Sequence, residues 1–445
     1  MNKSTLALAI AAGVLAQQAS AAGFVEDSKA TLGLRNFYIN TDYRDGTGPN
    51  KNEEWGQGFD LRFISGYTQG TVGFGVDAIG LLGVKLDSGG GTNGAANSAA
   101  YGGTVFPSKS NGEAVDDFSS LGLTAKAKIS QTELKLGTLQ PKLPVIVTND
   151  GRLLPQTWEG GQLTSGDIKD LTLVGGQIEH VKGRNSSNNE QLAINGASPR
   201  TINSNKFIYA GGDYKITKDL TAQYYYGNLE DFYKQHFLGL VHNWAIGPGV
   251  LKSDFRYFNS SDDGANGSNP LYYSTGNYSG VANGKGKVDN NLYSGLFLYS
   301  VAGHTFGGGY QVSNGSSDFP WLNQGDGSSN YTITDSQIQK FARAGERTWQ
   351  ARYSFDFAKV GVPGLTAGVV YLHGDNIDTV NARGAQAANG ASEWERDLNV
   401  GYVIQSGALK NLGLAWKNAS WRTDLPNTRS QDENRLIVSY SIPLL

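Results

Sequence analysis

The sequence contains no cysteine and only one methionine among its 445 residues. Without thiols the chain has no disulfide bonds, no thiolate metal site and no cysteine nucleophile. The five histidines show no spacing typical of metal ligands, so we expect neither a metal nor a cofactor. The formal net charge of −3 is mild and does not indicate a nucleic-acid partner.

Long hydrophobic runs are also missing, apart from one near the N-terminus. Lys3 is followed by an apolar run from Leu6 to Leu15 and then by Ala-Ser-Ala at 19–21, the pattern of a cleaved secretory signal peptide. The run is too short to span a bilayer. We therefore predict a signal peptide at residues 1–21 and a single-domain mature chain at 22–445, stabilised without disulfide bonds.

The chain is rich in glycine, tyrosine and short stretches of alternating hydrophobicity. Glycine accounts for 60 residues and tyrosine for 22. From Leu121 to Ile129 the odd-numbered residues are apolar, whereas Lys126 and Lys128 lie on the other face. This period of two is typical of β-strands with one apolar face, and it fits either a sandwich or a barrel.

The lengths of the connections favour a barrel. Short turns, such as 129–134 and 361–366, alternate with long segments rich in Gly, Ser, Asn and Asp, such as 87–110 and 259–289. Short turns at one end and long loops at the other are typical of transmembrane β-barrels. A mature chain of about 420 residues, at ~10 per strand plus connections, allows roughly 16 to 18 strands around an aqueous lumen. The sequence predicts an all-β, transmembrane antiparallel β-barrel in the outer membrane.

One segment does not fit this succession of strands and turns. Residues 149–165, NDGRLLPQTWEGGQLTS, follow about five strands and show no alternation. We interpret residues 139–165 as a constriction loop that folds into the lumen. Its leucines and its tryptophan would pack on the barrel interior, while Arg152 and Gln156 would face the pore. The alternative is an ordinary extracellular loop, because most connections lie at the surface.

Several stretches are recognisable as family motifs, above all GTVGFGVDA (70–78), RLLPQT (152–157), GERTWQARYSFDFAKVGVPGLT (345–366) and NRLIVSYSIPLL (434–445). With further stretches along nearly the whole mature chain, they resemble the OprD-type substrate-specific porins of Gram-negative outer membranes. The resemblance implies an 18-stranded barrel with an inward constriction loop. It also implies passive uptake of small carboxylate-bearing nutrients along a row of basic side chains on one wall.

By this resemblance Arg152 is the arginine of the constriction loop, and Arg352 and Arg435 lie on the wall. Strand alternation independently directs Arg352 and Arg435 into the lumen. The same alternation directs further residues inward: the basic Lys126, Lys128, Lys135, Arg256 and Lys417, and the acidic Asp60, Asp77, Asp254 and Asp356. Each of these charges belongs either to a wall ion pair or to a selective contact. Fixed cations can replace the hydration that a carboxylate loses in a narrow pore, and arginine does so with a planar fork.

The expected solute depends on one departure from the family pattern. In the branch that takes basic amino acids, the loop before the WQARY strand carries acidic and tyrosine groups that hold a cationic solute. Here the segment TDSQIQKFARAGE (334–346) contains Lys340 and Arg343, and Asp335 is its only acid before Glu346. We therefore expect anionic or aromatic organic acids as solutes, with Lys340 lining the pore, and keep a basic amino acid or peptide porin as the alternative.

Other classes of protein fit the sequence less well. A barrel hydrolase needs a nucleophile, a base and an acid in contact, and no spacing of Ser, His and Asp singles out such a triad. The long loops and the inward segment argue against a general, unselective pore. Alternation begins by Leu32, which leaves no room for the plug domain of a coupled receptor. As partners we expect outer-membrane lipid, lipopolysaccharide and carboxylate solutes, in a monomer or a loose homotrimer.

Overall fold

The computed structural model describes residues 23–46, 50–88, 103–195, 203–265, 287–322, 329–380, 386–426 and 428–445. The signal peptide expected at residues 1–21 lies outside these residues. Within the described ranges, no helix is long and apolar enough to cross a membrane. The same ranges contain no group of three or more His, Asp or Glu side chains that could hold a metal ion.

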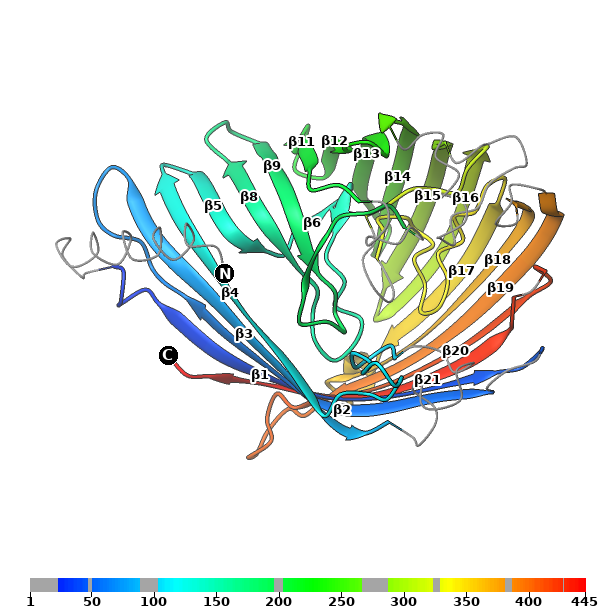
Figure 1. Ribbon diagram of the computed structural model, residues 1–445, viewed down its shortest axis with the longest axis horizontal. Helices are drawn as coiled ribbons and strands as arrows, with labels where there is room; N and C mark the ends of the chain where they lie inside the picture. Colours follow the sequence, from blue (N-terminus) through cyan, green and yellow to red (C-terminus); the bar gives the residue numbers. More distant parts are fainter. Residues whose placement is uncertain are drawn as a thin grey trace.

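In the described residues, eighteen long strands form one closed antiparallel barrel (Figure 1). Neighbours in the wall follow the order of the chain, and the last strand pairs with the first, with Arg35 opposite Ser439. The all-β antiparallel barrel of 18 strands expected from the sequence is confirmed. The wall strands are β1 (Lys29–Tyr43), β2 (Lys51–Ile64), β3 (Gly73–Asp87), β4 (Asp117–Ile129), β5 (Thr132–Leu139), β8 (Thr157–Ser165), β9 (Leu171–Lys182), β11 (Phe207–Lys215), β12 (Leu220–Leu229), β13 (Tyr233–Ile246), β14 (Gly249–Asp262), β15 (Asp289–Val301), β16 (His304–Gly315), β17 (Arg347–Asp356), β18 (Leu365–Val380), β19 (Gln386–Val403), β20 (Gly413–Thr423) and β21 (Gln431–Pro443).

Three short strands and one 3-10 helix complete the described elements. β6 (Lys142–Leu143) and β7 (Ile146–Val147) pair with each other, and Figure 1 shows β6 inside the ring of wall strands. β10 (Asn189–Gln191) extends the pairing of β9 beyond the wall. The 3-10 helix η2 (Phe357–Val360) lies in the connection from β17 to β18.

Alternation along each strand gives the wall an apolar outer face. On β4, Leu121 is 74% exposed and Leu123 43%, whereas Thr124 and Lys126 on the opposite face are buried. The same exposure of large apolar side chains recurs around the wall, at Leu238, Phe255, Phe297, Phe306, Val400 and Leu436. An apolar outer face with polar residues inside is the arrangement of a barrel that is surrounded by lipid and encloses water.

The connections at the two ends of the barrel differ in length, as the sequence indicated. β15 and β16 are joined by Ala302 and Gly303, whose φ angles of 50° and 87° are those of a tight hairpin turn. Several connections at the other end are long, although residues 230–232 join β12 to β13 there in a connection of three residues. Two of the long connections fold inward: residues 140–156 between β5 and β8, here the first inward segment, and the described residues 316–322 and 329–346 between β16 and β17, here the second inward segment.

The inward fold of the first segment agrees with the sequence interpretation, but its boundaries differ. Residues 157–165, expected within the loop 139–165, instead form wall strand β8, which pairs with both β5 and β9. Leu139 likewise belongs to β5. The sequence pattern concealed β8 because Gly160 and Gly161 interrupt the alternation of apolar and polar side chains in its middle.

Candidate functional site

The first inward segment crosses the lumen and packs on strands near both ends of the chain. Leu153 and Leu154 are each 2% exposed and belong to one buried cluster with Phe37 and Ile39 of β1. Trp158, at the start of β8, is also buried, and its indole nitrogen donates to Thr148 Oγ1 at 3.1 Å. The sequence interpretation that these three apolar side chains pack on the barrel interior is therefore correct.

Two glycines on β2 make room for this packing. A Cβ atom on Gly58 would lie 2.9 Å from the carbonyl oxygen of Leu153, and one on Gly56 would lie 2.8 Å from Leu153 Cδ2. Both distances are shorter than real Cβ contacts; at Gly58 the neighbouring atom is backbone, so a larger residue there would displace the segment, whereas at Gly56 it would push the side chains of Leu153 and Phe106 aside. Glycine is thus required here by the close approach of another part of the chain.

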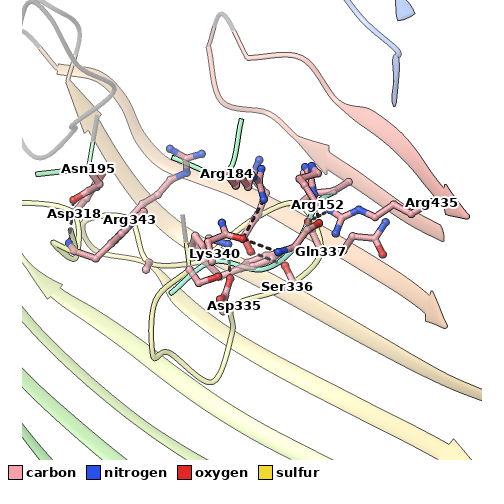
Figure 2. A pocket seen from close by; sticks show the side chains of 18 residues that line it. Arg152, Arg184, Asn195, Asp318, Asp335, Ser336, Gln337, Lys340, Arg343 and Arg435 are labelled. Atoms are coloured by element: carbon pink, nitrogen blue, oxygen red, sulfur yellow. Dashed lines mark hydrogen bonds and ion pairs between the residues drawn. The ribbon is translucent and has the colours of Figure 1, made fainter. Parts of the chain in front are cut away.

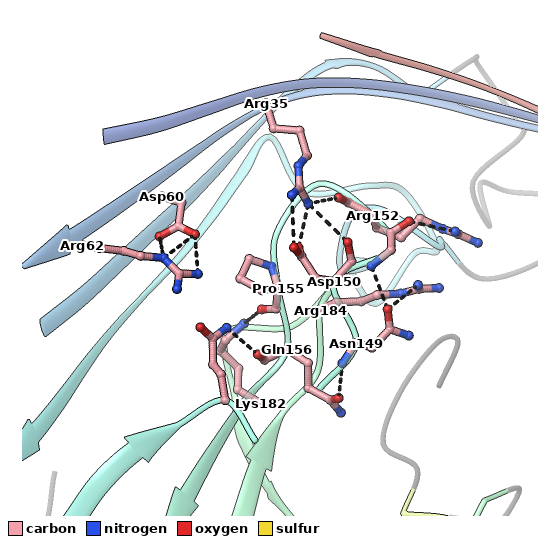
Figure 3. A network of polar contacts seen from close by, with 12 residues as sticks. Arg35, Asp60, Arg62, Asn149, Asp150, Arg152, Pro155, Gln156, Lys182 and Arg184 are labelled. Atoms are coloured by element: carbon pink, nitrogen blue, oxygen red, sulfur yellow. Dashed lines mark hydrogen bonds and ion pairs between the residues drawn. The ribbon is translucent and has the colours of Figure 1, made fainter. Parts of the chain in front are cut away.

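The tip of the first inward segment is tied to β1 by an ion pair (Figure 3). The Arg35 guanidinium donates to the two carboxylate oxygens of Asp150 at 2.7 and 3.2 Å, and to the carbonyl oxygen of Arg152 at 2.7 Å. Such a bidentate pair restrains orientation as well as distance.

The base of the same segment is held by hydrogen bonds to its backbone. Lys182 on β9, which is 3% exposed, donates to the carbonyl oxygens of Pro155 and Gly183 at 3.3 and 3.1 Å. Gln156 accepts the backbone N–H of Asn149 at 3.1 Å and is buried. Gln156 therefore braces the segment and does not face the pore, contrary to the sequence interpretation.

The second inward segment is anchored to the wall by carboxylates. Glu395 on β19 accepts the backbone N–H groups of Ile338 and Gln339, both at 2.8 Å. Asp397, two residues further along the same face, accepts the backbone N–H of Gln337 at 3.2 Å. The turn 337–339 is thereby fixed against the inner face of the wall.

A second set of charges holds the end of this segment where it returns to the wall. Arg343 Nε lies 3.5 Å from Glu393 of β19, whose other oxygen accepts the Trp421 indole N–H at 2.8 Å. Glu346 accepts the backbone N–H of Arg343 at 3.0 Å. Burial, together with the negative charge of Glu393, raises the pKa of Glu346 well above its ordinary value.

A cavity of about 380 Å³ lies between the two inward segments (Figure 2). Its described lining includes the side chain of Trp321 and two acidic residues, Asp318 and Asp335. The basic residues outnumber the acidic ones and come from both inward segments, from β21 and from the loop after β9; they are Arg152, Arg184, Lys340, Arg343 and Arg435.

Both acids of this lining already have partners. Asp335 pairs with Lys340, and Asp318 accepts the backbone N–H of Ala344 at 2.8 Å. Beneath the lining, the buried carboxylate of Glu433 on β21 lies 2.6 Å from Arg435 Nε and 3.8 Å from Arg152 Nη2. Two arginines of the lining thus share one buried carboxylate.

Several of the expected pore residues meet at this cavity or below it. Arg152, Lys340 and Arg435 line the cavity. Arg352 and Lys417 instead line a recess of about 510 Å³ on the inner wall of β15 to β20. Arg352 donates to the carbonyl oxygen of Ile333 at 2.6 Å, whereas Lys417 has no hydrogen bond or ion pair with the described part of the chain.

Two expected pore residues are engaged in other contacts. Lys126 points inward but is buried, with Nζ 2.6 Å from Asp77 and 2.7 Å from the Ser65 carbonyl oxygen. Arg256 pairs with Asp254 at 2.8 Å and donates to the carbonyl oxygen of Tyr331 at 2.8 Å, so it supports the second inward segment. The expectation that these two side chains line the pore is corrected, because neighbouring groups cover them.

Two further basic residues, Lys128 and Arg184, remain to be compared with the sequence prediction. Lys128 is exposed near the short turn after β4, with Nζ 5.7 Å from the Tyr67 ring centre, and does not reach the cavity. Arg184, which donates to Asn149 Oδ1 at 3.2 Å, was not among the predicted residues. It follows the end of β9, where alternation no longer indicates direction.

Comparisons with known proteins agree with this architecture. A family model described as "outer membrane porin, OprD family" matches residues 22–444. The porin-like protein GalP of Pseudomonas putida is 38% identical over 435 residues, which cover 98% of this chain and 96% of the relative. Porin D of Pseudomonas aeruginosa is 34% identical over 469 residues, with 100% and 99% coverage.

Solved structures of Pseudomonas aeruginosa porins are similar over nearly the full length. OccK8 (OprE) is 61% identical with a TM-score of 0.84, and the match covers 95% of this chain and 100% of that one. OpdK, solved with vanillate, is 37% identical with a TM-score of 0.82 and the same coverage. These relatives are channels and not enzymes. The chain belongs to the OprD family, the substrate-specific porins of the Gram-negative outer membrane.

Proposed function

We propose that this porin mediates passive uptake of small anionic carboxylates, including aromatic ones, through the cavity between the two inward segments. The observation that carries the proposal is the cavity lining, in which basic side chains outnumber acidic ones and both described acids already have partners. A carboxylate that enters the cavity loses hydration, and the guanidinium and ammonium groups replace it. Arginine suits this role because its planar fork matches a carboxylate.

The next cations along the wall supply further steps for the same solute. Lys417 on β20 lies directly opposite Arg435 on β21 in the strand register. Lys417 and Arg352 then share the recess below. A solute that passes from the cavity to this recess exchanges one set of cations for another. Conduction requires several weak sites of this kind, since a single tight site would retain the solute.

The alternative, a channel for basic amino acids, needs acidic groups on the pore surface. The described acids near the constriction are instead buried: Glu393, Glu395 and Glu433 are 1%, 0% and 4% exposed. Their oxygens accept hydrogen bonds from the second inward segment, from Trp421 or from Arg435. Acids engaged in this way offer little to a cationic solute, which favours the anionic class.

Aromatic carboxylates are favoured by two further observations. Trp321 contributes a large aromatic side chain to a cavity that is lined mostly by charged and other polar residues. The structure of OpdK was solved with vanillate, which is itself an aromatic carboxylate. The proposal for this chain rests on the first observation, and the second shows that a related barrel has been studied with that chemistry.

The test compares solutes that differ in charge and in ring content. Purified protein is placed in planar bilayers for reversal potentials under a salt gradient, and in liposomes for swelling rates with benzoate, arginine and a neutral sugar. We expect an anion-selective reversal potential and faster swelling with benzoate than with arginine. A parent channel that takes arginine faster than benzoate would overturn the proposal and assign the protein to the basic amino acid branch.

We also propose that residues 1–21 are removed on export. Support comes from the charged start, the apolar run and the Ala-Ser-Ala sequence, and from a family match that begins at residue 22. Mass spectrometry of protein purified from outer membranes measures the mature N-terminus directly. An N-terminus at Met1 would contradict the proposal.

A further inference from the structure

Glu395 on β19 is held by backbone N–H groups and not by a basic side chain. It is 0% exposed, and no described basic side chain lies within ion-pair distance of it. Each of its two oxygens instead accepts one backbone N–H, from Ile338 and Gln339, at 2.8 Å. A buried carboxylate is costly unless it is hydrogen-bonded in this manner.

Three consecutive backbone N–H groups of the second inward segment therefore point at wall carboxylates. The N–H of Gln337 bonds Asp397 at 3.2 Å, and the next two bond Glu395. Successive N–H groups that converge on one point form a concave site that binds anions. Here the protein's own Glu395 occupies that site, so the carboxylate holds the segment to the wall.

The other face of the same turn is held from β21. Arg435 donates to the carbonyl oxygen of Gln337 at 2.7 Å, and the Gln337 side chain donates to Glu433 at 3.1 Å. Lys340 follows directly after the anchored turn and lines the cavity. The position of the Lys340 ammonium group thus depends on the placement of this turn as well as on its ion pair with Asp335.

We propose that Glu395 is a positioning residue for anion selectivity. Its carboxylate holds the turn 337–339 against β19, and this contact keeps Lys340 and Arg343 at the cavity. The inference rests on the proposed preference for anions. It assigns to a fully buried acidic residue a role in attracting acidic solutes, exerted through the placement of two basic side chains.

The direction of the expected effect makes the test sharp. Neutralising an acid of the pore wall cannot lower the preference for anions by electrostatics alone, because the preference rises if the acid was charged and stays the same if it was neutral. In Glu395→Gln the amide group has one acceptor oxygen and one NH₂ group, which faces a backbone N–H donor. We expect the turn to detach, the conductance to rise and the anion-to-cation permeability ratio to fall, by roughly two- to fivefold if Lys340 is displaced by a few ångströms.

The matched control neutralises an acid that lies on the lumen side without holding a segment. Asp60 on β2 pairs only with Arg62 of the same strand, at 2.8 Å, among its described contacts. Asp60→Asn should leave the conductance nearly unchanged and raise the anion preference slightly. Both variants should show the parent's shift in mobility between unheated and heated denaturing gels, which reports a closed barrel.

A second pair of variants tests the anchor from the segment's side. Ile338→Pro removes one of the donated N–H groups without altering the wall, and should reproduce the effect of Glu395→Gln. Lys340→Gln should also lower the anion preference, but its conductance should rise less than that of Glu395→Gln. The double variant Glu395→Gln/Lys340→Gln should lose little further selectivity beyond Glu395→Gln, because Lys340 is already displaced.

The outcomes separate this inference from the proposed function. A parent channel without anion preference would overturn the proposed function itself. A parent with anion preference, in which Glu395→Gln raises that preference or leaves it unchanged, would overturn only the positioning role.

Discussion

The substitution Arg152→Gln isolates the contribution of one constriction arginine. The side chain is 11% exposed, with Nη2 3.8 Å from Glu433 and Nε 3.0 Å from Thr104 Oγ1. Glu433 keeps its closer contact with Arg435 at 2.6 Å in the variant, so no buried carboxylate is left without a partner. The variant should therefore fold, and its effect should appear in the channel.

The expected magnitude follows from the charges around the cavity. Two unit charges 4 Å apart interact by about 4 kcal/mol at an effective dielectric constant near 20. Glu433 offsets part of the Arg152 charge, and pore water and salt screen the remainder over about 8 Å at physiological ionic strength. A net loss of ~1 kcal/mol remains, which is about a fivefold change in occupancy by a carboxylate.

The assay measures swelling rates with benzoate and with a neutral sugar, together with reversal potentials at low and high salt. Benzoate uptake should slow by several fold, sugar uptake should change much less, and the change in reversal potential should shrink at high salt. As a control, Lys128→Gln removes an exposed lumen lysine outside the cavity and should have a smaller effect. Equal slowing of benzoate and sugar would refute the electrostatic reasoning, because it would indicate a distorted pore.

Three further variants test the placement of the inward segments. Asp150→Asn breaks the exposed ion pair to β1, which is worth roughly 0.2–1 kcal/mol; single-channel conductance should rise modestly, and an unchanged conductance would contradict a tethered tip. Gly58→Ala places a Cβ against Leu153 and should raise conductance more strongly, whereas a normal conductance would mean that β2 yields instead. The pKa of Glu346 is raised by burial and by Glu393, so its contribution to docking should be lost as pH rises through that value. Glu346→Gln should make the conductance less dependent on pH, and a pH profile equal to the parent's would exclude this residue as the titrating group.

The barrel could be predicted from the sequence because the alternation of apolar and polar residues that indicates it is a local pattern. Alternation along a strand needs only neighbouring residues, and it directed Arg352 and Arg435 inward correctly. The same alternation could not show whether an inward side chain reaches the channel. Lys126 is covered because Ser65, directly after β2, and Asp77 on β3 approach it, and this depends on the register between strands.

The contacts that shape the constriction join residues far apart in the sequence, so local sequence patterns do not reveal them. Glu395 meets Ile338 across 57 residues, and Arg35 meets Asp150 across 115. In the sequence, Glu395 is one acid among others in an alternating strand. Its role follows only when the second inward segment is placed against β19.

The contact between the first inward segment and the closing strands bears on how the porin is built. The segment emerges from the middle of the wall, but it rests on β1 and β2, and its Arg152 faces β21. The wall behind it is complete only when the last strand of the chain has paired with the first. In a partly assembled barrel, the first inward segment would lack the strands on which it packs, and the lumen would not be constricted. Selectivity is therefore the last property that the chain acquires during assembly. A channel that discriminates between solutes is also evidence that β21 has paired with β1.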